Sequence, residues 1–236
     1  NGYAPFLLKK NDEGEYIRYG EMRSYFGSNK RWERPTVHDK YYVPMDLFDG
    51  HVYAKGSLIL TMMEEVLGTD SFWKAVRHYT KINQYKCVET ADLKKSVEEV
   101  TGQNLDWFFR QWLYKAGYPK YDVKWNYTQR NRSVKLTIKQ TQDGNLFKMP
   151  VKITIDKEEH TLWVEDKEVT FEIPSIKRPE MVIFNSGSLI PCELNFHKSL
   201  SEWILQLEKA PHILDRIAAV NVLKEKKGRR VVETAL

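Results

Sequence analysis

The hydrophobic period of this chain changes at Gly117-Tyr118-Pro119, and this change is the feature that most constrains its fold. From about residue 50 to this turn, apolar residues recur at three- and four-residue spacing, as they do in an α-helix. After the turn, short segments rich in β-branched and aromatic residues alternate between apolar and polar positions, as in strands. The helical period returns at residue 199. We therefore predict an α+β multidomain chain with three parts, which are residues 1–118, 119–198 and 199–236.

The first part predicts four helices after residue 50. One of them runs from Val52 to Leu67 with an almost wholly apolar body, and Gly68 follows where a helix end favours glycine. The other three each begin near a residue with N-cap chemistry: Thr69 with Asp70, Thr90, and Asn104. Gly117 is predicted to end the fourth.

The opening 50 residues are less regular. We expect residues 1–10 to finish a helix and Asn11 to Gly14 to form a turn, because Asn, Asp and Gly are turn formers. The stretch from there to Tyr42 is predicted to form a short helix and an extended loop.

The second part predicts an antiparallel β-sandwich, because six or seven short strands are separated by turn formers. The six clearest segments are 121–127, 133–140, 149–156, 160–165, 169–174 and 179–184. The third part predicts two amphipathic helices. Two such helices do not bury their own apolar faces, so they either begin a further helical domain or pack back on the sandwich.

Composition and charge narrow the range of partners. The net charge of +5 is mild, and the densest basic run, from Lys224 to Arg230, indicates a solvated helix end rather than a nucleic-acid site, because no nucleic-acid-binding module accompanies it. No membrane span is predicted, since no run approaches the necessary length of about eighteen apolar residues. Cys87 and Cys192 are far apart and outside any CxxC spacing, so we expect two isolated thiols, with one disulfide as the alternative.

Tyr53 is the main candidate for chemistry. From the residues alone, a buried tyrosine at a helix start is more often structural, with a packed ring and a satisfied hydroxyl. A catalytic role requires its phenol to face a cleft and to donate a hydrogen bond to an oxygen that becomes negative. His51, two residues earlier, either approaches the same cleft or has a loop role. Glu64-Glu65 and Glu98-Glu99 are expected on solvated helix faces, because helical neighbours point in different directions.

An ordered series of motifs resembles the zinc aminopeptidases of the aminopeptidase N type, a gluzincin family. The matching residues are Val52-Tyr53-Ala54-Lys55-Gly56-Ser57, then Phe72, Tyr79 and Thr90-Ala91-Asp92-Leu93, then Gly102, Leu105, Phe108 or Phe109, and Trp112, and finally Gly117-Tyr118-Pro119. Their order and spacing run through residues 50–119. Ala54 departs from the family, which usually has Glu there, and Ser57 replaces Ala.

The resemblance implies the helical lobe of a thermolysin-like catalytic domain, then a β-sandwich, then the start of a HEAT-like helical domain. It also implies peptide substrates and hydrolysis of N-terminal residues. Family members hold Zn²⁺ through two His and a Glu, use a second Glu as general base, and stabilise the tetrahedral oxyanion with a tyrosine. Only that tyrosine maps onto this sequence, as Tyr53.

The HExxH zinc motif is absent from the sequence. None of its six histidines forms an i, i+4 pair, so we predict no metal ligands or cofactor-binding residues in this chain and expect zinc in a full-length parent. The chain alone is then expected to be inactive. The alternative is a non-catalytic, aminopeptidase-like scaffold for protein–protein interaction. The sequence leaves the compartment, the oligomeric state and the preferred substrate side chain open.

Overall fold

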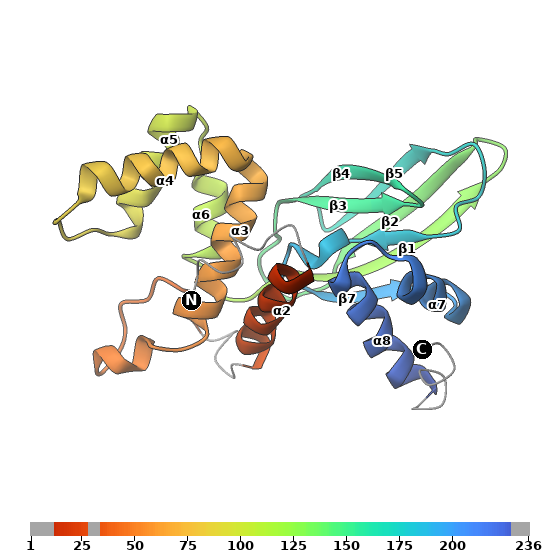
Figure 1. The fold of residues 1–236 in the computed structure, drawn as a ribbon, viewed down its shortest axis with the longest axis horizontal. Coiled ribbons are helices and arrows are strands. Elements are labelled where there is room, and N and C mark those ends of the chain that lie inside the picture. Colours follow the sequence, from red (N-terminus) through yellow and green to blue (C-terminus); the bar gives the residue numbers. More distant parts are fainter. Residues whose placement is uncertain (1–11, 28–33, 228–236) are drawn as a thin grey trace. The chain divides into compact units, whose positions relative to one another are not determined.

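The computed structural model describes residues 12–27 and 34–227 (Figure 1). These residues form two compact units, one of residues 20–117 and one of residues 12–19 with 118–227. The predicted end of a helix at residues 1–10 lies outside the described residues. The division into three domains stays a prediction.

Helices make up the unit of residues 20–117. In chain order these are the end of α2 (Asp12–Gly27), η1 (Pro44–Leu47), η2 (His51–Lys55), α3 (Gly56–Leu67), α4 (Thr69–Asn83), α5 (Thr90–Thr101) and α6 (Asp106–Trp112). Large apolar side chains of α3, α4 and α6 form much of its core, where they are almost completely removed from water. They include Leu58, Met62, Met63, Phe72, Phe108, Phe109 and Trp112.

Several predicted helix ends are wrong in detail. Gly68, and not Thr69, is the N-cap of α4, because its positive φ of 79° lets the chain pass from α3 to α4 with Gly68 as the one residue between them. Glu89 is the N-cap of α5, one residue before the predicted Thr90. The α6 helix begins at Asp106 and ends at Trp112, well before the predicted end at Gly117.

The predicted turn from Asn11 to Gly14 is also wrong, because α2 begins at Asp12. Its first turn carries three acidic residues, and the helix dipole favours negative charge there. Contacts with distant parts of the chain add to this preference. Glu15 Oε1 lies 2.5 Å from His212 Nδ1, and Arg18 donates a hydrogen bond to the Gly187 carbonyl at 2.6 Å.

The predicted solvation of the two acidic pairs is only partly right. Glu64 is not on a solvated face, since only 2% of its surface is exposed and α3 is buried on most of its circumference. Glu65 is half-buried. Glu99 is exposed, whereas Glu98 is half-buried and accepts a hydrogen bond from the N–H of Leu105 at 3.0 Å.

Strands make up most of the second unit. They are β1 (Lys120–Thr128), β2 (Ser133–Gln140), β3 (Met149–Ile155), β4 (Glu158–Val164), β5 (Glu168–Pro174), β6 (Val182–Phe184) and β7 (Glu193–His197). Four of them form a sheet in the order β5-β2-β1-β7, and three form a sheet in the order β4-β3-β6. The two sheets contact each other at the rings of Tyr121 and Phe184, whose centroids are 5.1 Å apart.

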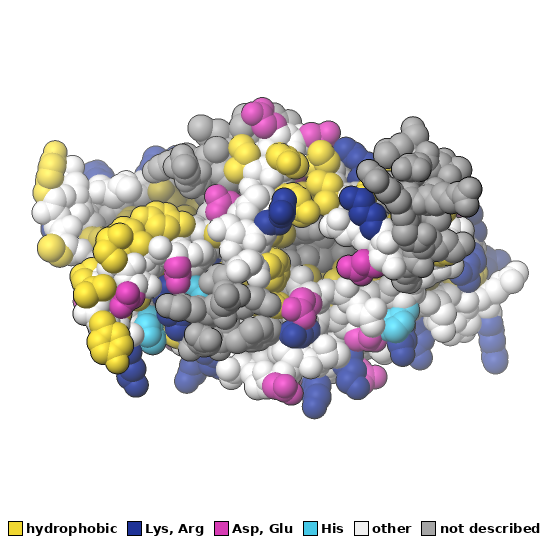
Figure 2. Space-filling view, turned by 90° about the horizontal axis from the view of Figure 1, so that it is seen from below, with side chains coloured by type: hydrophobic (Ala, Val, Ile, Leu, Met, Phe, Trp, Pro, Cys, Tyr) yellow, Lys and Arg dark blue, Asp and Glu magenta, His cyan; other side chains and the backbone are white. Residues whose placement is uncertain are grey.

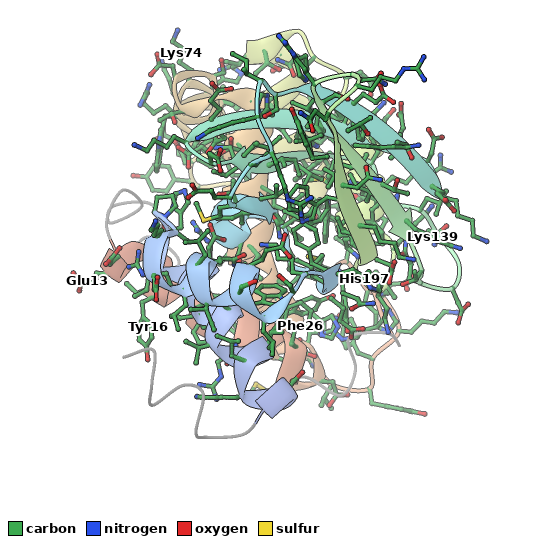
Figure 3. All side chains as sticks on the ribbon, turned by 90° about the vertical axis from the view of Figure 1, so that its right-hand side faces the viewer. Glu13, Tyr16, Phe26, Lys74, Lys139 and His197 are labelled. Atoms are coloured by element: carbon green, nitrogen blue, oxygen red, sulfur yellow. The ribbon has the colours of Figure 1, made fainter. Side chains whose placement is uncertain are left out.

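The prediction of a purely antiparallel sandwich needs correction. β7 has no counterpart among the six predicted segments, and it pairs in parallel with β1, with Lys120 opposite Glu193. The four-stranded sheet is therefore mixed, whereas both pairings in the three-stranded sheet are antiparallel. Lys139 of β2 and His197 of β7, both labelled in Figure 3, are exposed polar side chains of the mixed sheet.

The two C-terminal helices, α7 (Leu200–Lys209) and α8 (Ile213–Lys227), pack back on the strands of their own unit. The ring of Trp203 on α7 lies edge-on to Phe196 of β7, with centroids 6.4 Å apart. Asp215 of α8 accepts hydrogen bonds from the backbone N–H of Gly187, which follows β6. The two helices thus contact the strand-containing part of their unit, and the start of a further helical domain stays a prediction.

No helix among residues 12–27 and 34–227 has the length and apolar character that crossing a membrane requires. Basic and acidic side chains are interspersed among the described residues on the face drawn in Figure 2. In the basic run near the C-terminus, Lys224 is exposed.

Candidate functional site

Tyr53 lies in a single π-helical turn, η2, that leads directly into α3. The predicted helix from Val52 to Leu67 is thus helical throughout, but its first turn is wider than an α-helical turn. The N–H of Lys55 donates to the carbonyl of Gly50 at 2.8 Å, five residues back. Single π-helical turns of this kind occur frequently at functional sites.

The side chain of Tyr53 is 62% exposed. Its ring lies beside that of Phe48, with centroids 6.0 Å apart, and its hydroxyl has no hydrogen-bond partner within the described residues. The buried tyrosine with a satisfied hydroxyl, which the residues alone favoured, is therefore not what the structure contains. The phenol is available to donate a hydrogen bond. The catalytic role of Tyr53 stays a prediction.

Asp49 anchors the start of this turn. Its carboxylate accepts a hydrogen bond from Arg34 Nη2 at 2.6 Å and another from the backbone N–H of His51 at 2.8 Å. Its backbone carbonyl accepts from the N–H of Tyr53 at 3.3 Å. Burial raises the pKa of Asp49, but the hydrogen bonds from Arg34 and His51 outweigh it, and the pKa is lower than usual. The carboxylate is therefore ionised at neutral pH.

His51 is completely buried beneath the turn. Its ring lies edge-on to the ring of Tyr25, with centroids 5.8 Å apart, and its Nδ1 is 3.3 Å from Asp49 Oδ2. Burial lowers its pKa, and the charges of Arg34 and Lys55 lower it further against the opposing effect of Asp49. The ring is neutral at neutral pH. Because a carboxylate only accepts, Nδ1 holds the proton, and His51 acts as a packed support rather than as a cleft residue.

Lys55, two residues after Tyr53, is also completely buried. Its Nζ lies 5.5 Å from the centroid of the Tyr25 ring and has no hydrogen-bond partner among residues 12–27 and 34–227. Burial, together with the charge of Arg34, lowers its pKa to about 8. The side chains of Tyr53 and Lys55 thus project from the same turn into opposite environments. Tyr53 is exposed to solvent, whereas Lys55 is enclosed.

The zinc site of the family that the sequence resembles is not formed by the described residues. Among residues 12–27 and 34–227, no group of three His, Cys, Asp or Glu side chains is placed to hold a metal ion. Histidines here pair singly with carboxylates, as His78 does with Glu99 at 3.1 Å and His197 with Asp122 at 2.8 Å. The donor set of this part of the chain therefore does not fit Zn²⁺.

Two residues that support the turn, Asp49 and Arg34, were not predicted. An Asp shortly before a helix start is a recognisable capping signal, so the supporting role of Asp49 was predictable from the sequence. Arg34 was not, because it is fifteen residues from its partner.

Cys87 and Cys192 are free thiols, so the isolated arrangement is confirmed over the disulfide. Burial raises the pKa of the Cys192 thiol to about 12. It stays protonated at neutral pH, and a protonated thiol is a poor nucleophile.

Known proteins resemble this chain in both sequence and fold. The family model of the Peptidase family M1 domain matches residues 27–112. "Probable aminopeptidase 1" of Sulfurisphaera tokodaii is 24% identical over 168 residues, which are 67% of this chain and 21% of that protein. "Aminopeptidase M1-D" of Oryza sativa subsp. japonica is 36% identical over 78 residues, which are 33% of this chain and 9% of that protein.

Among solved structures, aminopeptidase A of Legionella pneumophila, crystallised in complex with aspartic acid, matches with a TM-score of 0.73 at 19% identity. The match covers 88% of this chain and 25% of that structure, and at this identity it shows the fold alone. The order of helices, two small sheets and C-terminal helices therefore follows an aminopeptidase-like arrangement. The chain is a homologue of the peptidase family M1 aminopeptidases. It spans only about a fifth of Probable aminopeptidase 1.

Proposed function

We propose that this chain is part of a zinc-dependent aminopeptidase, in which Tyr53 donates a hydrogen bond to the oxyanion formed when an N-terminal peptide bond is attacked. The observation that carries the proposal is the exposed side chain of Tyr53, whose hydroxyl is unengaged within the described residues, on a turn inside the matched residues 27–112. An oxyanion donor needs an unengaged hydroxyl on a rigid element, because a donor already used elsewhere gains nothing as charge develops.

The support beneath Tyr53 has the character that such a donor requires. Asp49 holds the backbone of the turn through its carbonyl and its carboxylate, and Arg34 holds that carboxylate. The buried ring of His51 and the buried side chain of Lys55 fill the space on the protein side. The phenol therefore leaves a turn whose neighbouring side chains are fixed, which reduces the reorganisation needed during the reaction.

The described residues do not provide metal ligands, so we assign zinc and the general base to other parts of a longer protein. Within this chain, the contribution to the reaction is limited to Tyr53 and to the walls of the helical unit. Peptides are the proposed substrates, by analogy with the relatives named above.

An activity assay on the purified chain tests whether zinc and the general base come from other parts of a longer protein. With an aminoacyl 4-nitroanilide and added Zn²⁺, the chain alone is expected to release no product above the buffer control. Release that a chelator abolishes would contradict the proposal, because the chain would then hold its own metal. In a longer protein that contains the chain, absence of bound zinc together with absence of peptidase activity would instead favour the scaffold alternative.

A further inference from the structure

Two buried lysine ammonium groups of this chain have sharply different surroundings. Lys198 donates a hydrogen bond to Gln206 Oε1 at 2.5 Å, and its Nζ lies 4.6 Å and 4.8 Å from the ring centroids of Phe196 and Trp203. Lys55 Nζ lies 5.5 Å from the Tyr25 ring, and it has no hydrogen-bond partner within the described residues. Lys198 is compensated by its neighbours, whereas Lys55 is not.

The charges around Lys55 do not compensate it either. Asp49 is the carboxylate of the turn, and it is already paired with Arg34 at 2.6 Å. His51 is neutral, so it adds no negative charge. Within the described residues, the charged group that acts on Lys55 is the like-signed Arg34. The positive charge of Lys55 is therefore buried without a compensating negative charge, and a buried charge without a partner is costly.

A second buried nitrogen atom, Nε2 of His51, belongs to a side chain that also lies against the Tyr25 ring. His51 and Lys55 are four residues apart in one π-helical turn, and both lie against the ring of Tyr25. His51 Nε2 is buried and, like Lys55 Nζ, has no hydrogen-bond partner among residues 12–27 and 34–227. Two such nitrogen atoms around one ring are an unusual combination, because most buried polar groups are satisfied.

We propose that Lys55 is the centre of a buried carboxylate-binding site, bordered by His51 and Tyr25. A carboxylate supplies the missing acceptor and the missing negative charge together, which a neutral carbonyl or hydroxyl does not. In the neutral His51 ring, Nε2 carries a lone pair, so a water molecule bound beside the carboxylate can donate a hydrogen bond to it. The site does not depend on a catalytic role of Tyr53.

Acetate is the probe for a carboxylate that comes from solution. We expect sodium acetate to raise the melting temperature of the whole chain in a saturable way. Sodium chloride at equal ionic strength and acetamide, the neutral analogue, are not expected to do so. In Lys55→Met the apparent Kd for acetate should weaken at least tenfold. Lys198→Met is the matched control and should keep the wild-type Kd.

An NMR measurement on the wild-type chain does not depend on whether the variants fold. On addition of acetate, the amide resonances of His51 and Lys55 are expected to shift in an NMR spectrum, and those around Lys198 are not. Lys55→Gln, which keeps a polar side chain of similar length, serves as a second variant.

A carboxylate that the protein itself supplies gives a different result. The site is then already filled, so acetate has no effect on the wild type, and Lys55→Met lowers the melting temperature at pH 7. That loss should shrink as the pH falls below 4, because an ammonium partner lowers the pKa of a carboxyl group and protonation then removes its negative charge.

The proposal is overturned by a different pair of results. These are no effect of acetate on the wild type, and a Lys55→Met variant whose melting temperature at pH 7 equals or exceeds that of the wild type. A lysine that is buried without a partner is expected to behave in this way, because an apolar side chain then replaces an uncompensated charge.

Discussion

Arg34 Nη2 donates a hydrogen bond to Asp49 Oδ1 at 2.6 Å, and both side chains are largely withdrawn from solvent, with exposures of 7% and 23%. The pair joins the segment before η1 to the start of the π-helical turn. Asp49 also holds the backbone of this turn, because it accepts hydrogen bonds from the backbone N–H groups of His51 and Tyr53. The position of the candidate catalytic tyrosine therefore depends on an ion pair that does not include it.

Replacing Asp49 by Ala should destabilise the helical unit. The substitution removes the acceptor of Arg34 and of the His51 N–H and leaves a buried guanidinium without this partner. We expect a loss of about 1–3 kcal/mol in the free energy of unfolding, the range for leaving buried polar groups unpaired. Urea denaturation followed by circular dichroism measures it.

Asp39→Ala is the control for Asp49→Ala, because Asp39 is exposed and lies in the same connecting segment. It should change the free energy of unfolding by less than about 0.5 kcal/mol, as is usual for surface substitutions. Equal effects of the two variants would show that the Arg34–Asp49 pair does not hold the turn.

The stability of the strand-containing unit should depend on pH through Asp215. Burial raises the pKa of this carboxyl to about 6 from the usual value of 3.8, against the hydrogen bonds from Gly187 and Ser186. A raised pKa in the folded state means that the folded protein binds the proton more tightly. The contribution to stability is therefore complete below pH 3.8 and is lost as the pH rises through 6.

Comparison with Asp215→Asn isolates this effect from the other titrating groups, including Glu15 and His212. As the pH falls from about 7 to about 4, the free energy of unfolding of the wild type should rise relative to the variant by up to about 3 kcal/mol. Urea denaturation at a series of pH values provides the measurement. A difference that is constant over this range would mean that Asp215 titrates normally.

Gly187 should resist replacement because of its backbone conformation. Its φ is +69°, and a Cβ atom there would lie 3.5 Å from the ring of His212, which is ordinary van der Waals contact. Strain rather than collision is thus the expected cost of Gly187→Ala, about 1–2 kcal/mol. Gly144→Ala, at φ +89° with open space around it, is the matched control. Thermal unfolding of both variants should give similar losses, and a much larger loss at Gly187 would reveal a packing role.

The alternation of side chains predicted some strands well, and tertiary pairing decided others. The strand Ser133–Gln140 is confirmed at both ends. Its completely buried residues Val134, Leu136 and Ile138 alternate with Lys135, Thr137 and Lys139, which are exposed or half-buried. The strand β7 was missed, since only Phe196 of its five residues is buried and its position depends on pairing with β1. Turn formers likewise predicted the wrong structure at Asp12, which begins a helix and pairs with the distant Arg216 at 3.3 Å.

Some features of the candidate site were likewise predictable from the sequence, and others were not. Tyr53 was predicted as the candidate residue because its motif is contiguous in sequence, and its catalytic role stays a prediction. Its exposure and the π-helical geometry of its turn were not predictable from an apolar helical pattern, which looks the same for either kind of helix. The burial of Lys55 was equally hidden. A lysine beside a glycine is expected on the surface, but the structure places its ammonium group against Tyr25.

The hydroxyl of Tyr53 is proposed to stabilise charge during peptide hydrolysis, and the kcat of Tyr53→Phe tests this role most directly. The measurement uses a zinc-loaded longer protein that contains this chain. Tyr42→Phe is the control, because Tyr42 is a fully exposed tyrosine of the same unit. We predict that Tyr53→Phe lowers kcat about 10²–10³-fold with unchanged zinc content, while Tyr42→Phe leaves kcat unchanged. A Tyr53→Phe variant with the kcat of the wild type would contradict the account.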